Sequence, residues 1–350
     1  MTIKLINTEN IKRLLIRSTN WIGDAIMTTP AVRSIRENFP RAHISILAKP
    51  WVAPVFENSI HVDTVLIYDG SGRHKGIWGR LRLARDLRQY HFEAAILLQN
   101  AFEAALITFL AGIPLRIGYN TDGRSFLLTH PVPCKPEYKK YHQTRYYLNI
   151  LQGAGLKNGN QDLFFIVNSK QRERAREILS EHGISKQERI VGINPSATYG
   201  PAKQWPIERY ARLADKIQGL SDVRIVIFGG PEDIPLGRKI SQMMKQTPVD
   251  LSGRTELGEA MALIERCSLF VTNDSGLMHV AAALNVLLIA IFGSTNSTTT
   301  GPLSSNSRIV QVPVECSPCL KPECLEGHLK CMGKIDVDMV FDVAKEMMRA

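Results

Sequence analysis

No apolar stretch of the sequence is long and uninterrupted enough to span a bilayer. The longest, 277–292, contains His279 and Asn285 and is predicted to form a short helix followed by a strand. Charged residues interrupt the segment 1–20, so a signal peptide is not expected there. These absences predict a cytoplasmic protein, and attachment to a membrane surface stays open as an alternative.

The usual features of nucleic-acid-binding proteins are also missing. The sequence has no helix-turn-helix pattern, no aromatic RNA-binding strand and no long block of Lys and Arg. It nevertheless carries a formal net charge of +10, from 43 Lys and Arg against 33 Asp and Glu. Such an excess favours an anionic partner, so an acidic lipid or a phosphorylated substrate is expected in place of nucleic acid.

A basic amphipathic segment, 76–90, is one place where such a partner could bind. It contains the apolar side chains of Trp78 and Leu81 among arginines. These arginines are Arg80, Arg82, Arg85 and Arg88. A helix of this kind can lie on anionic lipid head groups. It can equally be an ordinary surface helix, because exposed basic faces are common.

Length and periodicity together predict two α/β domains. The 350 residues exceed what one hydrophobic core usually fills, given about 150 residues per domain. Helical and strand periods alternate along the chain, which favours parallel sheets. Strands are predicted at 13–17, 44–48, 64–68, 94–98, 190–194, 224–228, 269–272 and 286–292, and helices at 207–218, 257–267, 277–284 and 337–348.

A polar stretch, 157–162, is the expected linker between the domains. We therefore expect a first lobe over 1–162 and a second over 163–335. The remaining segment, 336–350, is predicted to form a C-terminal helix, with packing back on the first lobe as one possibility.

The most informative stretch is 271–285, which reads V-T-N-D-S-G-L-M-H-V-A-A-A-L-N. A buried strand runs into Asp274, Ser275 and Gly276, and an apolar helix begins at once. Glycine lets backbone approach a ligand, and the free N–H groups that open a helix attract phosphate. In open α/β sheets ligands bind at the carboxyl ends of strands, so these residues are candidates for a binding site. The alternative is that Asp274 or Ser275 only caps the helix.

Two loops at other strand ends carry a carboxylate and a lysine. Asp24 follows a glycine and precedes a predicted helix, where it could act as a general base or as an N-cap. Lys203 lies in a loop of small residues, 195–206, which is suited to holding a diphosphate with the lysine as counter-charge. The alternative for Lys203 is a solvated surface lysine.

A third loop holds two neighbouring acidic residues, Glu232 and Asp233, after the strand predicted at 224–228. Acidic groups at this position commonly bind ribose hydroxyls, and a solvated turn is the alternative.

Several motifs occur in one fixed order along the chain. They are G-D at 23–24, F-L-A-G-I-P-L-R-I-G-Y at 109–119, G-P-A-K-Q-W-P at 200–206, F-G-G-P-E-D at 228–233 and V-T-N-D-S-G-L-M-H-V-A-A-A-L at 271–284. From Ile16 to about Pro302, this set resembles the lipopolysaccharide heptosyltransferases of glycosyltransferase family 9. The resemblance implies a GT-B fold, with two Rossmann-like lobes whose parallel sheets face a central cleft. It assigns the acceptor to the first lobe and the ADP-sugar to the second.

The resemblance also implies a reaction. It is an inverting transfer of L-glycero-D-manno-heptose from ADP-heptose to the heptosyl-Kdo-lipid A inner core of lipopolysaccharide. Asp24 would take the proton from the attacking hydroxyl, and Asn100 matches a family position facing the acceptor. The net charge of +10 suits this anionic, lipid-linked acceptor and peripheral contact with the cytoplasmic face of the inner membrane.

The second lobe would hold the donor. Lys203 and the helix N-terminus at Ser275 and Gly276 would stabilise the departing diphosphate, whose charge grows in the transition state. By resemblance, Asp274 contacts the donor sugar and His279 lies nearby.

The ribose is assigned to Glu232, although the adjacent Asp233 stays open. No D-x-D-like carboxylate pair stands at a strand end of this lobe, so no metal on the diphosphate and no cofactor are expected. Two alternatives to the whole reaction remain. One is a relative that uses a different lipopolysaccharide core acceptor, and the other is a non-catalytic sugar-nucleotide-binding module.

Four late cysteines do not belong to the motif set. Cys316, Cys319, Cys324 and Cys331 could hold structural zinc, although their spacing is irregular for a zinc ribbon. Free or redox-sensitive thiols are the alternative, since a reducing cytosol disfavours disulfides.

Overall fold

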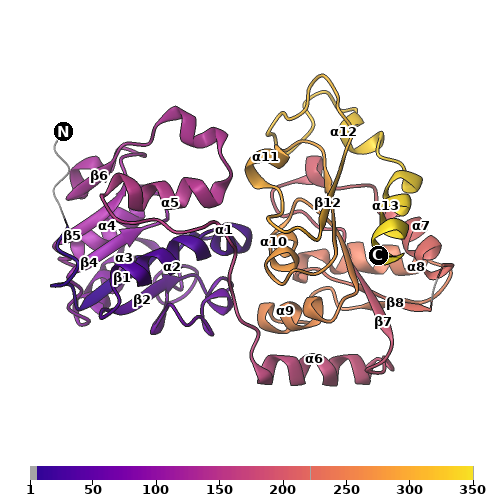
Figure 1. Ribbon diagram of the computed structural model, residues 1–350, viewed down its shortest axis with the longest axis horizontal. Coiled ribbons are helices and arrows are strands. Elements are labelled where there is room, and N and C mark those ends of the chain that lie inside the picture. Colours follow the sequence, from indigo (N-terminus) through magenta and orange to yellow (C-terminus); the bar gives the residue numbers. More distant parts are fainter. Residues whose placement is uncertain (1–5, 221, 350) are drawn as a thin grey trace. The chain divides into compact units, whose positions relative to one another are not determined.

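The computed structural model describes residues 6–220 and 222–349 (Figure 1). The chain divides into two compact units, Met1–Ile166 and Val167–Ala350. The expected linker belongs to the first unit, because Asn38 Nδ2 donates to Lys157 O over 2.7 Å and Gly159 N donates to Ser34 Oγ over 2.9 Å. These bonds hold the polar stretch on a helix of unit 1, so the boundary falls after Ile166 and not after residue 162.

Unit 1 is built on a six-stranded sheet with the order β3-β2-β1-β4-β5-β6. All its bonded strand pairs are parallel. The strands are β1 (Arg13–Arg17), β2 (His43–Ala48), β3 (Thr64–Ile67), β4 (Ala94–Leu97), β5 (Leu115–Tyr119) and β6 (His130–Val132). The central strands are buried along most of their length, as expected for a parallel sheet covered on both faces.

Helices flank the sheet of unit 1. They are α1 (Ile22–Met27), α2 (Thr29–Asn38), α3 (Gly76–Arg88), α4 (Phe102–Leu110) and α5 (Gln143–Gly153). Helix α2 packs against α5, and α3 packs against α4. Leu83 and Leu87 of α3 share a core with Leu15, Leu47 and Leu97 from the strands. The apolar spacing of α3 therefore serves the sheet on one side and leaves its other side to solvent.

Unit 2 repeats the plan with the strand order β12-β11-β10-β7-β8-β9, again in parallel pairs. Its strands are β7 (Arg189–Asn194), β8 (Val223–Ile227), β9 (Val249–Asp250), β10 (Leu269–Asn273), β11 (Leu288–Phe292) and β12 (Ser307–Gln311). Its helices are α6 (Ser169–Glu181), α7 (Ile207–Gln218), α8 (Ile234–Met243), α9 (Leu257–Glu265), α10 (Gly276–Ala283), α11 (Ser297–Thr300), α12 (Lys330–Gly333) and α13 (Val337–Arg349).

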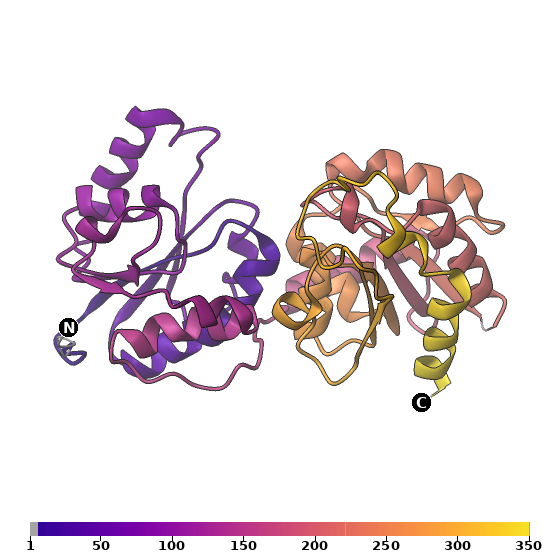
Figure 2. The ribbon, with the colours of Figure 1, turned by 90° about the horizontal axis from the view of Figure 1, so that it is seen from above.

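The C-terminal helix completes unit 2. Helix α13, yellow in Figures 1 and 2, packs against α7 and against β11 and β12. Val337, Val340, Ala344 and Met347 recur at helical spacing and enter the core of this unit. The apolar side chains of this helix are therefore covered by unit 2.

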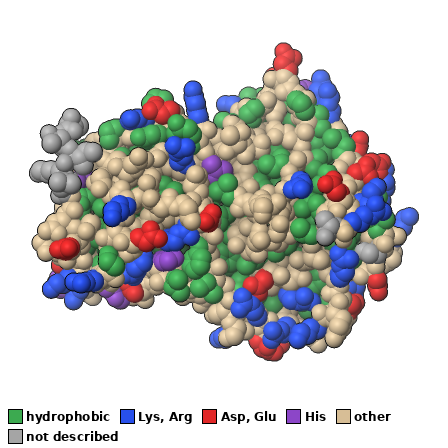
Figure 3. All heavy atoms as spheres, in the orientation of Figure 1, with side chains coloured by type: hydrophobic (Ala, Val, Ile, Leu, Met, Phe, Trp, Pro, Cys, Tyr) green, Lys and Arg blue, Asp and Glu red, His purple; other side chains and the backbone are tan. Residues whose placement is uncertain are grey.

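Within residues 6–220 and 222–349, no helix has both the length and the apolarity needed to cross a membrane. On the face drawn in Figure 3, Lys and Arg side chains are spread over the surface with Asp and Glu side chains between them.

Candidate active site

The carboxyl ends of β7 and β10 are joined by one buried amide. Asn273 Nδ2 donates to Pro195 O over 2.7 Å, and Asn273 Oδ1 accepts from Trp205 N over 3.1 Å and from Tyr210 Oη over 3.0 Å. Strands β7 and β10 are neighbours, so this amide holds both ends of the loop 195–206 at the end of β10.

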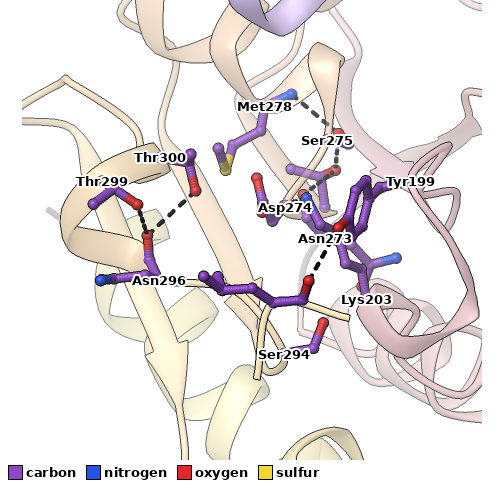
Figure 4. A network of polar contacts seen from close by, with 12 residues as sticks. Tyr199, Lys203, Asn273, Asp274, Ser275, Met278, Ser294, Asn296, Thr299 and Thr300 are labelled. Atoms are coloured by element: carbon purple, nitrogen blue, oxygen red, sulfur yellow. Dashed lines mark hydrogen bonds and ion pairs between the residues drawn. The ribbon is translucent and has the colours of Figure 1, made fainter. Parts of the chain in front are cut away.

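The same loop carries Lys203 to a carboxylate. Lys203 Nζ lies 2.7 Å from Asp274 Oδ2, and the two side chains are only 14% and 6% exposed (Figure 4). The ammonium also lies 4.9 Å from the centre of the Tyr199 ring. Lys203 is therefore a largely enclosed cation at a strand end, which rules out the alternative of a solvated surface lysine.

The capping alternative at this loop holds for Ser275 and not for Asp274. Ser275 is the N-cap of α10, and its Oγ accepts from Met278 N over 3.3 Å. The same hydroxyl contacts Thr272 Oγ1 at 3.0 Å and accepts from Asn194 Nδ2 over 3.0 Å. Asp274 precedes the cap, so its carboxylate remains available for Lys203 and for a ligand.

The two other predicted residues of this stretch lie in the first turns of α10. Gly276 is the first residue of the helix, and His279 is buried one turn further along. The opening N–H groups of α10 therefore lie beside the Lys203–Asp274 pair, as required for an anion site.

The acidic loop after β8 separates its two carboxylates. Asp233 accepts from Ser196 Oγ over 2.6 Å and from Gly230 N over 2.7 Å, so it is committed to its own loop. Glu232 is exposed, and within the described residues it has no hydrogen bond or ion pair. Glu232 is thus the carboxylate that is open to a hydroxyl ligand.

Sequence reasoning missed a set of buried polar atoms at the strand ends of unit 2. Asn194 Oδ1, Ser294 Oγ and Thr295 Oγ1 have no hydrogen-bond partner among the described residues. An unsatisfied buried polar group costs about 1–3 kcal/mol, so such atoms commonly mark ligand positions. Ser294 and Thr295 follow β11, the strand next to β10. A short polar run after an apolar strand was the signal for them in the sequence.

In unit 1, Asp24 is not an N-cap. The N-cap of α1 is Trp21, and Asp24 is the third residue of the helix. Its carboxylate is half-buried and accepts from Tyr147 Oη over 3.3 Å. Burial, reinforced by the charge of Asp24, raises the pKa of Tyr147 well above its ordinary value, so this phenol stays protonated and donates.

Asn100 follows β4, the neighbour of β1 in the sheet, and is held on both sides of its amide. Its Nδ2 donates to Tyr146 Oη over 2.7 Å, and its Oδ1 accepts from Arg124 Nη2 over 3.1 Å. Arg124 is fully buried, and burial lowers its pKa to about 10, so it remains charged at neutral pH. Sequence reasoning overlooked Arg124, which orients Asn100.

Two more cations lie at the same edge of this sheet. Arg17 ends β1 and is almost completely buried, and burial lowers its pKa to about 10. Its guanidinium lies 5.3 Å from the centre of the Tyr68 ring, and Lys49 Nζ lies 3.5 Å from the same centre. Burial, together with the charge of Arg17, lowers the pKa of Lys49. The carboxylate of Glu103 accepts from Tyr68 Oη beside them, so this cluster holds two cations against one carboxylate. Sequence reasoning did not locate it.

The six cysteines are free thiols. Cys316 and Cys319 are exposed, Cys324 is half-buried and Cys331 is buried. In the part of the chain that the structure describes, no three His, Cys, Asp or Glu side chains are grouped to hold a metal ion. Burial, together with the charges of the three other late cysteines, raises the pKa of the Cys331 thiol. Structural zinc and free thiols both stay predictions for this group.

The chain is similar to known proteins over most of its length. The model of glycosyltransferase family 9 (heptosyltransferase) matches residues 80–330. The lipopolysaccharide heptosyltransferase 2 of Escherichia coli K12 is 30% identical over 339 residues, which is 94% of this chain and 97% of that protein. The lipooligosaccharide heptosyltransferase 2 of Haemophilus influenzae is 31% identical over 96% of this chain and 99% of its own length.

A solved structure extends the likeness to three dimensions. The E. coli ADP-heptose LPS heptosyltransferase II matches with a TM-score of 0.82 at 27% identity, over 96% of this chain and 98% of that chain. The two parallel sheets with flanking helices are the two Rossmann-like lobes of the GT-B fold. The chain therefore belongs to glycosyltransferase family 9 and is a heptosyltransferase.

Proposed function

We propose that this heptosyltransferase moves L-glycero-D-manno-heptose from ADP-heptose to the heptosyl-Kdo-lipid A inner core of lipopolysaccharide, with inversion. The observation that carries the proposal is the enclosed Lys203–Asp274 pair beside the first turn of α10. The named relatives are heptosyltransferases 2, which supports this acceptor over other core positions. Family membership disfavours the alternative of a non-catalytic binding module.

On the donor side, Lys203 and the N–H groups of Ser275 and Gly276 bind the diphosphate. As the bond to ADP breaks, negative charge grows on the diphosphate, and these fixed positive groups stabilise it without reorganising. Asp274 orients Lys203 and contacts the heptose. His279 lies within α10, the helix that begins just after Asp274. Glu232 binds the ribose hydroxyls, which fits the engagement of Asp233 within its own loop.

On the acceptor side, Asp24 is the general base. It takes the proton of the attacking hydroxyl while that oxygen bonds to the anomeric carbon, and ADP leaves from the opposite face. A single displacement of this kind inverts the anomeric configuration. The Tyr147 hydroxyl, 3.3 Å from Asp24 Oδ1, keeps the carboxylate oriented and ionised between turnovers.

The acceptor carries carboxylates and phosphates, and the edge of the sheet in unit 1 offers cations to them. Arg17 and Lys49 are charged groups held at the ends of β1 and β2 around the Tyr68 ring. Asn100, oriented by Arg124, supplies a hydrogen-bonding amide at the same edge. These groups favour an anionic sugar next to the hydroxyl that Asp24 activates.

We also propose peripheral contact with the cytoplasmic face of the inner membrane through the outer side of α3. Ile77 and Trp78 are 67% and 80% exposed at the start of this helix, and Leu81 follows on the same side. Arg82 and Arg85 lie exposed beside them. Apolar side chains bordered by arginines match the boundary between lipid head groups and acyl chains.

Helix α4 extends this surface. An ion pair of 2.7 Å between Arg80 Nε and Glu103 Oε2 holds the first turn of α4 beside α3. The rings of Phe102 and Phe126 lie 6.1 Å apart at this end of α4, and Phe126 is 74% exposed. An apolar surface formed by several elements supports membrane contact more strongly than one exposed tryptophan would.

The experiment that tests the reaction uses purified enzyme, ADP-heptose and heptosyl-Kdo-lipid A. We expect release of ADP with formation of a new glycosidic bond, whose anomeric configuration by NMR is opposite to that of the donor. Retention of configuration, or ADP release without a glycosylated product, would reject the proposed mechanism.

A further inference from the structure

The cysteine-bearing loop between β12 and α12 is bonded to the loops that form the donor site. Pro322 O accepts from Ala202 N over 3.0 Å, and Leu320 O accepts from Tyr199 Oη over 3.0 Å. On the other side, Leu320 N donates to Ser294 O over 2.8 Å. One short stretch of this loop therefore contacts both the Lys203 loop and the loop after β11.

One glycine makes this approach possible. A Cβ at Gly200 would lie 2.3 Å from Pro322 O. No side chain fits at that distance, and the φ of +152° at Gly200 also disfavours any other residue, so this position requires glycine. Gly200 lies three residues before Lys203, within the loop that carries it.

The position of Lys203 thus depends on contacts from two directions. After Lys203, the loop is held by the bond from Trp205 N to Asn273 Oδ1. Before it, the segment from Tyr199 to Ala202 is held by the cysteine-bearing loop, which has no helix or strand between β12 and α12. Loss of the second set of contacts would free one side of the loop that carries the ammonium.

We propose that the stretch Leu320–Pro322 is a positioning element of the donor site, which holds Lys203 where the diphosphate binds. This inference rests on the proposed role of Lys203. The stretch touches no substrate in this account, and it acts through Tyr199, Gly200 and Ala202. Preorganised charge is more effective than a mobile lysine, because no ordering has to occur when ADP-heptose binds.

The test is ADP binding to the full-length chain, measured by calorimetry in a double-mutant cycle. We expect Gly200→Ala, whose Cβ displaces Pro322, to weaken ADP binding about tenfold. In the Lys203→Ala background the same change should have almost no further effect, because the group that it misplaces is already gone. Gly183→Ala is the matched control, because Gly183 also has a positive φ, +68°, and a Cβ there meets nothing within 4 Å, so this variant should bind ADP normally.

A milder variant protects the test against misfolding. Tyr199→Phe removes only the hydroxyl that donates to Leu320 O and keeps the ring beside Lys203. We expect it to weaken ADP binding about two- to tenfold, again only when Lys203 is present.

The outcomes separate this inference from the function on which it rests. If Lys203→Ala binds ADP as tightly as the wild type, the proposed donor role of Lys203 fails. If Lys203→Ala weakens binding but the folded Gly200→Ala and Tyr199→Phe variants bind ADP normally, the positioning role is overturned. It is also overturned if their effects are undiminished in the Lys203→Ala background, because they then act independently of Lys203.

Discussion

The two units have the same strand order, but the side chains at the carboxyl ends of their strands differ. Each places six parallel strands in the same topological order, yet the carboxyl ends of the strands in unit 2 are joined by the amides and hydroxyls of Asn194, Asn273 and Ser275. The corresponding strand ends of unit 1 hold the buried cations Arg17 and Arg124. The shared strand order therefore does not fix the chemistry at the strand ends, which depends on the loops there.

The first helices of the two sites show the same contrast. In unit 2 the hydroxyl of Ser275 caps α10 by accepting a hydrogen bond from Met278 N. In unit 1 helix α1 starts at Ile22 without a side-chain cap, and the carboxylate of Asp24 points to Tyr147. Asp24 thus lies inside its helix, in contrast to Ser275 at the N-cap. In the proposed mechanism, unit 1 carries the base for the acceptor and unit 2 holds the leaving group.

The largest expected effect follows from removing the base in unit 1. Asp24→Asn should lower kcat about a hundred- to ten-thousand-fold, the usual cost of losing a general base, and leave ADP binding to unit 2 unchanged. Steady-state ADP release and calorimetry measure the two quantities. Asp162→Asn, at an exposed carboxylate of the same unit, is the control and should be fully active. Near-normal kcat in folded Asp24→Asn would remove Asp24 from the mechanism.

The matching change in unit 2 should affect both binding and rate. Lys203→Ala loses a charged contact to the diphosphate that tightens in the transition state, so kcat/KM should fall about ten- to a hundredfold. In steady-state kinetics with varied ADP-heptose, the KM for the donor should rise and kcat should fall. Lys216→Ala removes an exposed lysine that is also paired with a carboxylate, and it should behave as the wild type. A normal rate for Lys203→Ala would reject the proposed role of unit 2 in stabilising the leaving diphosphate.

The proposed membrane surface includes the exposed side of α3 in unit 1. Trp78→Glu should weaken sedimentation with phosphatidylglycerol vesicles about tenfold, because it puts a charge where an exposed apolar ring meets lipid. ADP binding should be unchanged. Ile60→Glu, at an equally exposed apolar residue outside α3, is the matched control. Equal vesicle binding by both variants would leave α3 as an ordinary surface helix.

A smaller effect should reveal how Asp24 is tuned. Tyr147→Phe removes a hydrogen bond to the ionised carboxylate, which raises the pKa of Asp24 relative to the wild type. A base with a raised pKa is lost to protonation at higher pH, so the acidic limb of the kcat/KM profile should move upward. Because burial keeps the Tyr147 phenol protonated, the alkaline limb should not move. An unchanged acidic limb would show that this phenol does not act on Asp24.

The smallest effect is expected from chelation. The positive charge at the diphosphate comes from Lys203 and from the N-terminus of α10, neither of which needs an ion. Turnover should therefore survive EDTA, with at most a modest stimulation by magnesium. Complete loss of activity on chelation, restored by one divalent metal, would show that a metal ion is needed at the diphosphate and would reject this prediction.

The sequence was most informative about local structure. Strand β1 and helix α7 begin and end at the predicted residues, because apolar periodicity and the proline before α7 are local signals. The C-terminal helix was also predicted, but its packing partner was not. An apolar stripe shows that a helix is covered and does not show by what.

Individual residues of the site were predicted from the sequence, but the contacts between them were not. Asp274 and Lys203 were both singled out, yet their ion pair joins residues 71 positions apart, and no spacing in the sequence indicates it. Arg17 and Arg124 were overlooked because an arginine is normally taken as a surface residue. Their burial depends on carbonyl groups that only the folded sheet edge brings together.

The choice of acceptor gives the sharpest test of the proposed reaction. ADP release should be compared for two purified substrates, Kdo-lipid A with and without the first heptose, at equal concentration and with saturating ADP-heptose. The account predicts rapid turnover with the heptosylated acceptor and only background release without it, since the attacking hydroxyl belongs to that heptose. Equal or faster turnover with the acceptor that lacks the heptose would contradict it.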